Sequence, residues 1–252
     1  MTDLPEPIPA ATLILMRPSA AGAPELLVME RAKSMAFAAG ALVFPGGRID
    51  PDDHLLAQRI GNRLEFAAAR VAAIRETIEE TGIAPAVTQP PDPRIVHQIR
   101  QELEEGTPFS TLVEAFGLTL DLAALTPFAR WCPTFQEARR FDTLFFVAEA
   151  PGGAAVATAS EAEAVRTLWA TAEEVLEEAD SGRGRIIFPT RRNLERLARF
   201  ASIEEARADA ERHPARKVVP WIEERGGDKW LCIPDDLGYP VTAELLETAR
   251  RT

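Results

Sequence analysis

The sequence predicts an α/β (α+β) fold in which helices pack on a β-sheet. Short apolar runs, typical of buried strands, alternate along the chain with segments of helical periodicity. Neither an internal repeat nor a long low-complexity segment interrupts this alternation. The 252 residues are 46% hydrophobic and 27% charged, which is an ordinary globular composition. The length therefore suits one large domain, or one domain with an extension.

The first third of the chain predicts three strands followed by a long helix. Helical periodicity extends from Leu64 to Thr81, and Gly82 ends the run as a helix C-cap would. The glycine turn Pro45-Gly46-Gly47 stops the third apolar run. The predicted strands are Ala11–Met16, Glu25–Met29 and Ala41–Phe44.

The rest of the chain continues the alternation. The predicted helices are Gln98–Glu105, Ser110–Phe116, Thr171–Ala179 with Thr171 as N-cap, Arg191–Phe200, and Ser202–Arg212 with a capping box. The predicted strands are Leu122–Trp131, Thr143–Glu149 and Val165–Trp169, followed by a hairpin of Val218–Glu223 and Lys229–Ile233 that turns on Gly226-Gly227-Asp228.

Composition also bounds the partners. The net charge of −11 argues against binding to a nucleic acid polymer, but a metal ion could reverse the local sign for a small phosphorylated substrate. Cys132 and Cys232 lie far apart in sequence, which predicts reduced structural thiols. The acidic, proline-broken start resembles no signal peptide, and no apolar run approaches the ~18 residues of a membrane span. We therefore expect a cytoplasmic protein without a membrane partner.

Three glutamates on the predicted helix are the first candidates for chemistry. Glu76, Glu79 and Glu80 have i, i+3, i+4 spacing, so their carboxylates share one helical arc. Like charges this close repel, and Arg75 alone cannot balance them. A divalent cation with hard oxygen ligands, Mg²⁺ or Mn²⁺, would balance them, usually with waters and a substrate phosphate completing its shell. The alternative is an acidic helix face in solvent.

The surroundings of these glutamates resemble the Nudix box of the Nudix hydrolases, G-x5-E-x7-R-E-U-x-E-E-x-G-U. Gly47 matches its first glycine, and Arg75–Ile83 match its last nine positions, with Thr77 where the family usually has a bulky apolar residue. The lone acid falls on Asp53 (53 − 47 = 6), but Arg75 follows 22 residues later (75 − 53 = 22) instead of eight. About 14 residues, roughly His54–Ala67, therefore interrupt the box.

The inserted segment has an apolar pattern of its own. Leu55, Leu56, Ile60 and Leu64 have helical spacing, which predicts a helix that covers one side of the domain. The resemblance further implies that Gly47 and Glu79 lie close in space despite the interruption.

The pattern upstream of the box resembles the branch that includes coenzyme A diphosphatases. Phe37, Gly40 and Phe44-Pro45-Gly46-Gly47 fit that branch, as does the downstream segment Arg130–Ala148. Ala36 occupies a position where the coenzyme A signature has a second arginine, and this departure weakens the substrate assignment. Lys33 or Arg31 could compensate from the same segment.

The resemblance implies a Nudix fold, a mixed β-sheet sandwiched between helices, over residues 7–180. Insertions are expected near 54–67 and 89–120, and residues 181–252 would form a helical and hairpin extension packed on the domain. The implied function is metal-dependent hydrolysis of a diphosphate linkage in a nucleoside diphosphate derivative, with coenzyme A or acyl-coenzyme A favoured. The alternatives are the same chemistry on nucleotide sugars, dinucleotides or nucleoside triphosphates, and a non-catalytic ligand-binding or regulatory module. The resemblance alone makes homodimerisation an option.

The family also implies roles for individual residues. Glu79 and Glu80 would be metal ligands, Glu76 a third ligand or the base that activates water, and the Gly47 carbonyl a further ligand. Arg75 would orient the glutamates; the alternative is a surface salt bridge.

The remaining candidate residues keep two interpretations each. Asp53 would position a metal-bound water or cap the inserted helix. Arg31 would contact phosphate or lie solvated at a strand end. Arg139, with Arg140, would clamp phosphate or mark the exposed end of a strand. Glu161 and Glu163 would supply an accessory carboxylate or remain solvated loop acids.

Overall fold

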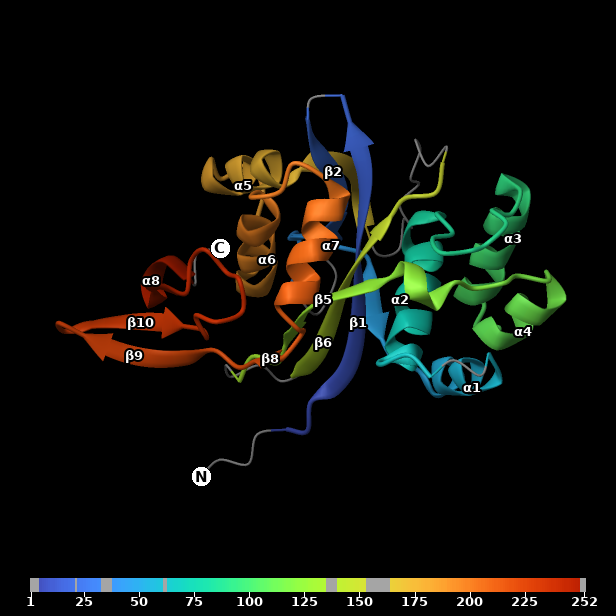
Figure 1. The fold of residues 1–252 in the computed structure, drawn as a ribbon, viewed down its shortest axis with the longest axis horizontal. Helices are drawn as coiled ribbons and strands as arrows, with labels where there is room; N and C mark the ends of the chain where they lie inside the picture. Colours follow the sequence, from blue (N-terminus) through green and yellow to red (C-terminus); the bar gives the residue numbers. More distant parts are fainter. Residues whose placement is uncertain are drawn as a thin grey trace.

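A mixed β-sheet lies at the centre of the molecule (Figure 1). The computed structural model describes residues 5–20, 22–32, 38–60, 63–134, 140–152 and 164–249, and within these ranges eight strands form this sheet. Six follow one another in the order β3-β2-β1-β6-β5-β8, while β4 pairs with β1 and β7 with β2. The pairs β1–β6 and β5–β8 are parallel and the others antiparallel. The strands are β1 Ile8–Ser19, β2 Gly22–Arg31, β3 Leu42–Val43, β4 Gly46–Arg48, β5 Thr126–Trp131, β6 Phe141–Glu149, β7 Ala164–Thr171 and β8 Lys217–Val218.

Helices cover both faces of this sheet, which confirms the predicted fold class. Figure 1 shows α1 to α4 on one side and α5, α6 and α7 on the other. The first group is α1 Pro51–Arg59, α2 Ala67–Thr81, α3 Pro93–Glu104 and α4 Phe109–Ala115. The second is α5 Ala172–Asp180, α6 Phe188–Leu197 and α7 Ile203–Arg212, and a short α8 Leu246–Ala249 follows near the chain end.

Strand β1 separates two hydrophobic cores. Because successive side chains of a strand point to opposite faces, Leu13 and Leu15 pack with α2, α3 and α4, whereas Ile14 and Met16 pack with α5, α6 and α7. The core around Ile14 and Met16 contains residues from both the predicted domain and the predicted C-terminal extension, such as Phe128 and Leu194. The division of the chain between these two parts stays a prediction. Both cysteines are buried and unpaired, as expected.

A small three-stranded sheet projects from the side of α6 (Figure 1). It consists of β9 Trp221–Arg225, β10 Asp228–Cys232 and β11 Ala243–Leu245. The predicted hairpin turn is confirmed, because Gly226 and Gly227 both have positive φ between β9 and β10. The predicted inclusion of Val218 was wrong: it belongs to β8 and pairs with Trp131 of the central sheet.

Several boundaries differ from prediction for identifiable reasons. Helix α2 begins at Ala67 because Phe66 has a left-handed conformation with φ of 60°. Helix α3 begins five residues early because Asp92 caps it and Pro93 opens its first turn. The predicted strand Leu122–Trp131 begins only at Thr126, after a 3₁₀ turn of Leu122–Ala124.

The segment that interrupts the box contains the expected helix, but its predicted apolar stripe was wrong. Helix α1 begins at Pro51, where proline and two aspartates suit the first turn. Of the four apolar residues, only Leu56 is buried; Leu55 is 51% exposed, and Ile60 and Leu64 also face solvent. The helix instead buries Asp53, Leu56 and Ala57.

Candidate active site

Strand β4 presents one main-chain edge to β1 and the other to helix α2. Leu13 N–H donates to Pro45 O at 2.9 Å and Ile49 N–H to Pro9 O at 3.1 Å, and Ala11 is paired with Gly47 between them. In an antiparallel ladder, hydrogen-bonded and non-hydrogen-bonded pairs alternate. This register therefore directs the Gly47 peptide groups toward β1, and those of its neighbours outward.

Charged side chains bind this outward edge at three alternate residues. Gly46 N–H donates to Glu80 Oε2 at 2.8 Å. The carbonyl of Arg48 accepts from Arg75 Nη2 at 2.9 Å, and Asp50 N–H donates to Asp53 Oδ2 at 2.8 Å. The two ends of the interrupted box are thus joined along one strand edge.

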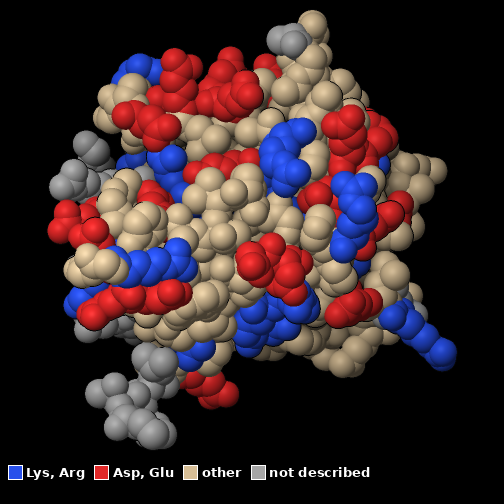
Figure 2. Space-filling view, turned by 60° about the vertical axis from the view of Figure 1, so that its left-hand side comes forward, with Lys and Arg blue, Asp and Glu red and all other residues tan. Residues whose placement is uncertain are grey.

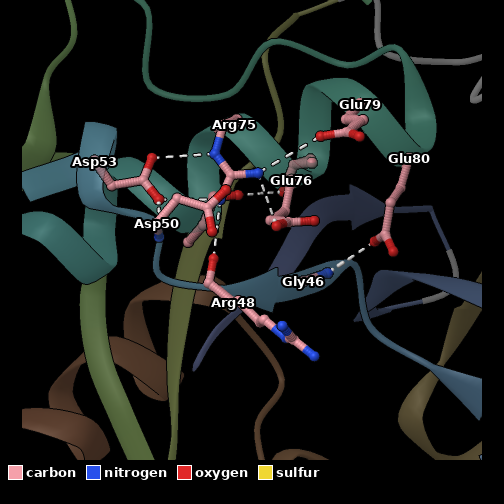
Figure 3. A network of polar contacts seen from close by, with 10 residues as sticks. Gly46, Arg48, Asp50, Asp53, Arg75, Glu76, Glu79 and Glu80 are labelled. Atoms are coloured by element: carbon pink, nitrogen blue, oxygen red, sulfur yellow. Dashed lines mark hydrogen bonds and ion pairs between the residues drawn. The ribbon is translucent and has the colours of Figure 1, made fainter. Parts of the chain in front are cut away.

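Arg75 is the centre of the network (Figure 3). Its Nε and Nη2 donate to the two carboxylate oxygens of Asp53 at 3.1 and 3.0 Å, and Asp53 has no exposed surface. On its other side, Nη1 donates to Glu76 Oε1 at 2.8 Å and lies 3.5 Å from Glu79 Oε2. A bidentate arginine–carboxylate pair holds the guanidinium plane in one orientation. The surface salt bridge considered from the sequence is excluded, because Arg75 is buried.

The charges in this network shift the titration of its members. Burial raises the pKa of the Asp53 carboxyl, although hydrogen bonds from Arg75 and Asp50 oppose the shift. Burial also disfavours the charged guanidinium of Arg75, but Asp53 and Glu76 outweigh it and raise its pKa. Arg75 therefore remains a cation.

The three glutamates of α2 have different surroundings. Glu80 is 2% exposed and reaches the Gly46 amide, whereas Glu76 and Glu79 face Arg75. Gly47 makes room for Glu76: a Cβ at Gly47 would lie 2.5 Å from its carboxylate. The expected proximity of the glycine turn and the acidic helix is confirmed.

No group of three His, Cys, Asp or Glu side chains is already arranged around a metal position within the described ranges. The residues nevertheless fit a divalent cation by two observations. The donors are carboxylates and main-chain carbonyls, which Mg²⁺ and Mn²⁺ prefer. Gly47 lacks the Cβ that would lie 2.5 Å from the Glu76 carboxylate, so this carboxylate can lie directly against the main chain of the glycine pair.

Two further positions of the box have local explanations. Thr77 is fully buried, and its hydroxyl donates to the Ala73 carbonyl at 2.7 Å, so a polar residue is tolerated there. Gly82 ends α2 in the left-handed conformation with φ of 66°, and its N–H donates to Ile78 O, as predicted for a C-cap.

The other predicted site residues have mixed outcomes. Asp53 does cap a helix, as the third residue of α1, and it also holds Arg75. Arg31 ends β2 beside β3, and its Nε is buried without a hydrogen-bond partner in the described part of the chain. Arg139, Glu161 and Glu163 lie outside the described residues, as do Lys33, Ala36 and Phe37.

Two features of the site were missed from the sequence. Arg48 is exposed next to Gly47, and among the described residues its guanidinium has no hydrogen bond or ion pair. Figure 3 shows this side chain pointing away from Arg75. Asp52 binds Ser110 of α4 with both carboxylate oxygens. The position of Arg48 directly after Gly46-Gly47 could have indicated its role from the sequence. No sequence signal indicates the contact between Asp52 and Ser110.

Comparison with known proteins agrees with this geometry, although no protein-family model matches the chain. A crystal structure of a Nudix hydrolase from Alicyclobacillus acidocaldarius is 30% identical, with a TM-score of 0.70, over 81% of this chain and 96% of that one. The chain belongs to the Nudix hydrolase family, which confirms the family resemblance.

One curated relative is more specific. Acyl-coenzyme A diphosphatase NUDT19 of Xenopus laevis is 26% identical over 234 residues, which cover 72% of this chain. The chain spans 61% of that relative's length. This similarity agrees with the resemblance to the coenzyme A diphosphatase branch.

Proposed function

We propose that this protein hydrolyses the diphosphate linkage of a nucleoside diphosphate derivative with the help of Mg²⁺ or Mn²⁺. The observation that carries the proposal is the arrangement of Arg75 and three glutamates of α2 beside Gly46 and Gly47 of β4. The alternative is a non-catalytic ligand-binding or regulatory module, and the presence of Glu76, Glu79 and Glu80 argues against it.

Glu76, Glu79 and Glu80 would hold the metal, together with a main-chain carbonyl of the glycine turn. Gly46 is the stronger candidate for that carbonyl, because its amide already faces α2, whereas Gly47 faces β1. A bound divalent cation screens phosphate oxygens and lowers the pKa of a water.

The chain's own residues have separable tasks in this proposal. Arg75 orients Glu76 and Glu79 by direct contact, and Asp53 fixes Arg75. Glu76 would accept a proton from the attacking water, or serve as a third ligand. Arg48 and Arg31 would supply positive charge for the substrate phosphates, since Arg48 is exposed and the buried Nε of Arg31 has no hydrogen-bond partner among the described residues.

Coenzyme A and its acyl derivatives are the first-choice substrates. The observation that favours them is the similarity to a protein named acyl-coenzyme A diphosphatase, together with the sequence pattern of that branch. Cleavage at the diphosphate would give 4′-phosphopantetheine, or its acyl form, and 3′,5′-ADP. The missing arginine at Ala36 still argues for testing nucleotide sugars, dinucleotides and nucleoside triphosphates.

The distribution of charged side chains on the surface is compatible with a small substrate. Figure 2 shows acidic and basic side chains intermixed on one face of the molecule, without a continuous basic surface there. The described residues contain no helix long and apolar enough to cross a bilayer. The cytoplasmic location, the homodimer and the absence of a nucleic acid partner stay predictions.

The test is a comparison of kcat/KM for coenzyme A, acetyl-coenzyme A, ADP-ribose, NADH and a nucleoside triphosphate, each with Mg²⁺ and with Mn²⁺. We expect a coenzyme A compound to have the highest value. A tenfold or greater advantage (about 1.4 kcal/mol) for one of the other substrates would reject the substrate assignment alone. Absence of hydrolysis for the whole panel would reject the diphosphatase proposal.

A further inference from the structure

Asp52 joins helix α1 to helix α4, which lies 58 positions further along the chain. Ser110 N–H donates to Asp52 Oδ2 at 2.8 Å, and the Ser110 hydroxyl donates to Oδ1 at 2.5 Å. Helix α4 has Pro108 as its N-cap residue, which provides no side-chain acceptor for the free amides of the first turn. Asp52 supplies that acceptor from another helix.

The neighbouring residue makes the corresponding contact to helix α2. Asp53 accepts from both Nε and Nη2 of Arg75 and is fully buried. Asp52 and Asp53 are consecutive in the first turn of α1, so the contacts to α4 and to Arg75 are anchored on the same helical turn. A continuous series of contacts therefore extends from α4 through Asp52, Asp53 and Arg75 to Glu76.

We propose that Asp52 is a positioning residue: by tying α1 to α4 it keeps Asp53 in place to hold Arg75, and hence Glu76 and Glu79, in working orientation. Helix α4 thereby braces helix α2, which contains Arg75 and the three glutamates. The kinetic consequence rests on the proposed diphosphatase function, whereas the tie itself does not.

Three substitutions separate this role from general stabilisation. Asp52→Ala removes both hydrogen bonds. Asp52→Asn retains them, because the amide oxygen accepts from the Ser110 N–H and the amide NH₂ donates to the Ser110 hydroxyl. Asp121→Ala is the matched control: Asp121 caps the Leu122–Ala124 turn through the Ala123 amide at 3.1 Å, without contact to the Arg75 network.

Asp52→Ala should lower kcat by about ten- to a hundredfold with KM changed by less than about twofold, as expected when a catalytic group is misplaced. Asp52→Asn should restore kcat to within about threefold of the wild type, and Asp121→Ala should leave it unchanged. The inference is overturned if Asp52→Ala retains full kcat, if Asp52→Asn is as impaired as Asp52→Ala, or if the control loses as much. Should Asp52→Ala not fold, Ser110→Ala, which removes only the hydroxyl bond, gives the same comparison at smaller amplitude.

A second measurement does not depend on turnover. The Arg75 Nε–H, assigned with Arg75→Lys, should exchange slowly with solvent in the wild type because Asp53 accepts from it. Its exchange should be at least about tenfold faster in Asp52→Ala and unchanged in Asp52→Asn and Asp121→Ala, at temperatures well below unfolding. Unchanged exchange in Asp52→Ala would overturn the inference whatever the activity. An inactive wild type with this exchange pattern would instead reject only the proposed function.

Discussion

Gly47→Ala should displace the Glu76 carboxylate without disturbing the backbone. The added Cβ would lie 2.5 Å from the Glu76 carboxyl atoms, where ordinary contact begins at 3.4 Å, so the carboxylate must retreat by about 0.9 Å (3.4 − 2.5). That movement breaks its 2.8 Å bond from Arg75. A misplacement of this size costs about a hundredfold in kcat.

The same substitution should change stability little. The Cβ meets the end of a flexible side chain, and Gly47 has no positive φ that alanine would strain. Loss of one hydrogen bond costs about 1 kcal/mol, and replacing glycine returns about 0.4–1 kcal/mol by reducing the freedom of the unfolded chain. We therefore expect the free energy of unfolding to change by less than about 1 kcal/mol.

Two other glycines make this experiment selective. Gly46→Ala places its Cβ 2.4 Å from the Ala11 carbonyl oxygen and 2.6 Å from the Thr12 Cα, both backbone atoms, so it should destabilise the fold by about 1–3 kcal/mol or more. Gly152→Ala meets nothing within 4 Å and should be neutral. The assay is metal-dependent hydrolysis of the best panel substrate, with urea unfolding for each variant. Wild-type kcat in folded Gly47→Ala would refute the reasoning, and partial recovery with the shorter acid in Gly47→Ala/Glu76→Asp would support it.

Three further predictions concern the charges of the site. Glu79→Gln and Glu80→Gln should each lower kcat at saturating metal by at least ~10²-fold. Both variants should stay folded, and the glutamine at position 80 can still accept a hydrogen bond from the Gly46 amide. Near-wild-type turnover in both variants would contradict the metal site. Arg48→Gln should raise KM by about ten- to a hundredfold with little change in kcat, measured beside the exposed control Arg59→Gln, and an unchanged KM would remove Arg48 from substrate binding. Because burial raises the pKa of Asp53, the folded protein keeps the Asp53 proton at a pH where the unfolded chain has lost it. The free energy of unfolding of the wild type minus that of Asp53→Asn should therefore fall as the pH rises from the ordinary aspartate pKa to the raised one, and then level off. Urea titrations over about pH 3–6 measure this difference, and a difference that rises with pH would contradict the pKa shift.

Local signals were sufficient to predict most of the architecture. Runs of apolar residues correctly indicated β1, β2, β3, β6 and β7, and the i, i+3, i+4 glutamates with Gly82 correctly located the end of α2. Strand β4 was missed, because Gly46-Gly47 has no apolar side chains and was interpreted as a turn. Thr171 and Ser202 do cap their helices, because an N-cap depends on atoms within one turn of the chain.

Contacts between distant segments were beyond these signals. Residues 122–125 are apolar, as in a strand, yet they form a turn whose carbonyls at Leu122 and Leu125 accept from the buried Arg70. The exposed Leu55 shows the same limit: helical spacing indicates which residues share a face, but packing partners decide whether that face is buried. The Asp52–Ser110 bond depends on where α4 docks, which no local pattern specifies.

The geometry of β4 explains why an interrupted box can still assemble one site. Gly46 and Arg48 of β4 and Asp50, two residues after the strand, are alternate positions along the chain. Their main-chain groups bind Glu80, Arg75 and Asp53, in that order. Asp53 and Arg75 also bind each other, so both ends of the inserted segment are fixed independently of its length. The entropy of closing a loop grows only logarithmically with length, so 14 added residues cost little as long as these end contacts persist. The same reasoning indicates that the two parts of the box are held together by Asp53 and Arg75, at the two ends of the insertion, and not by residues within the insertion.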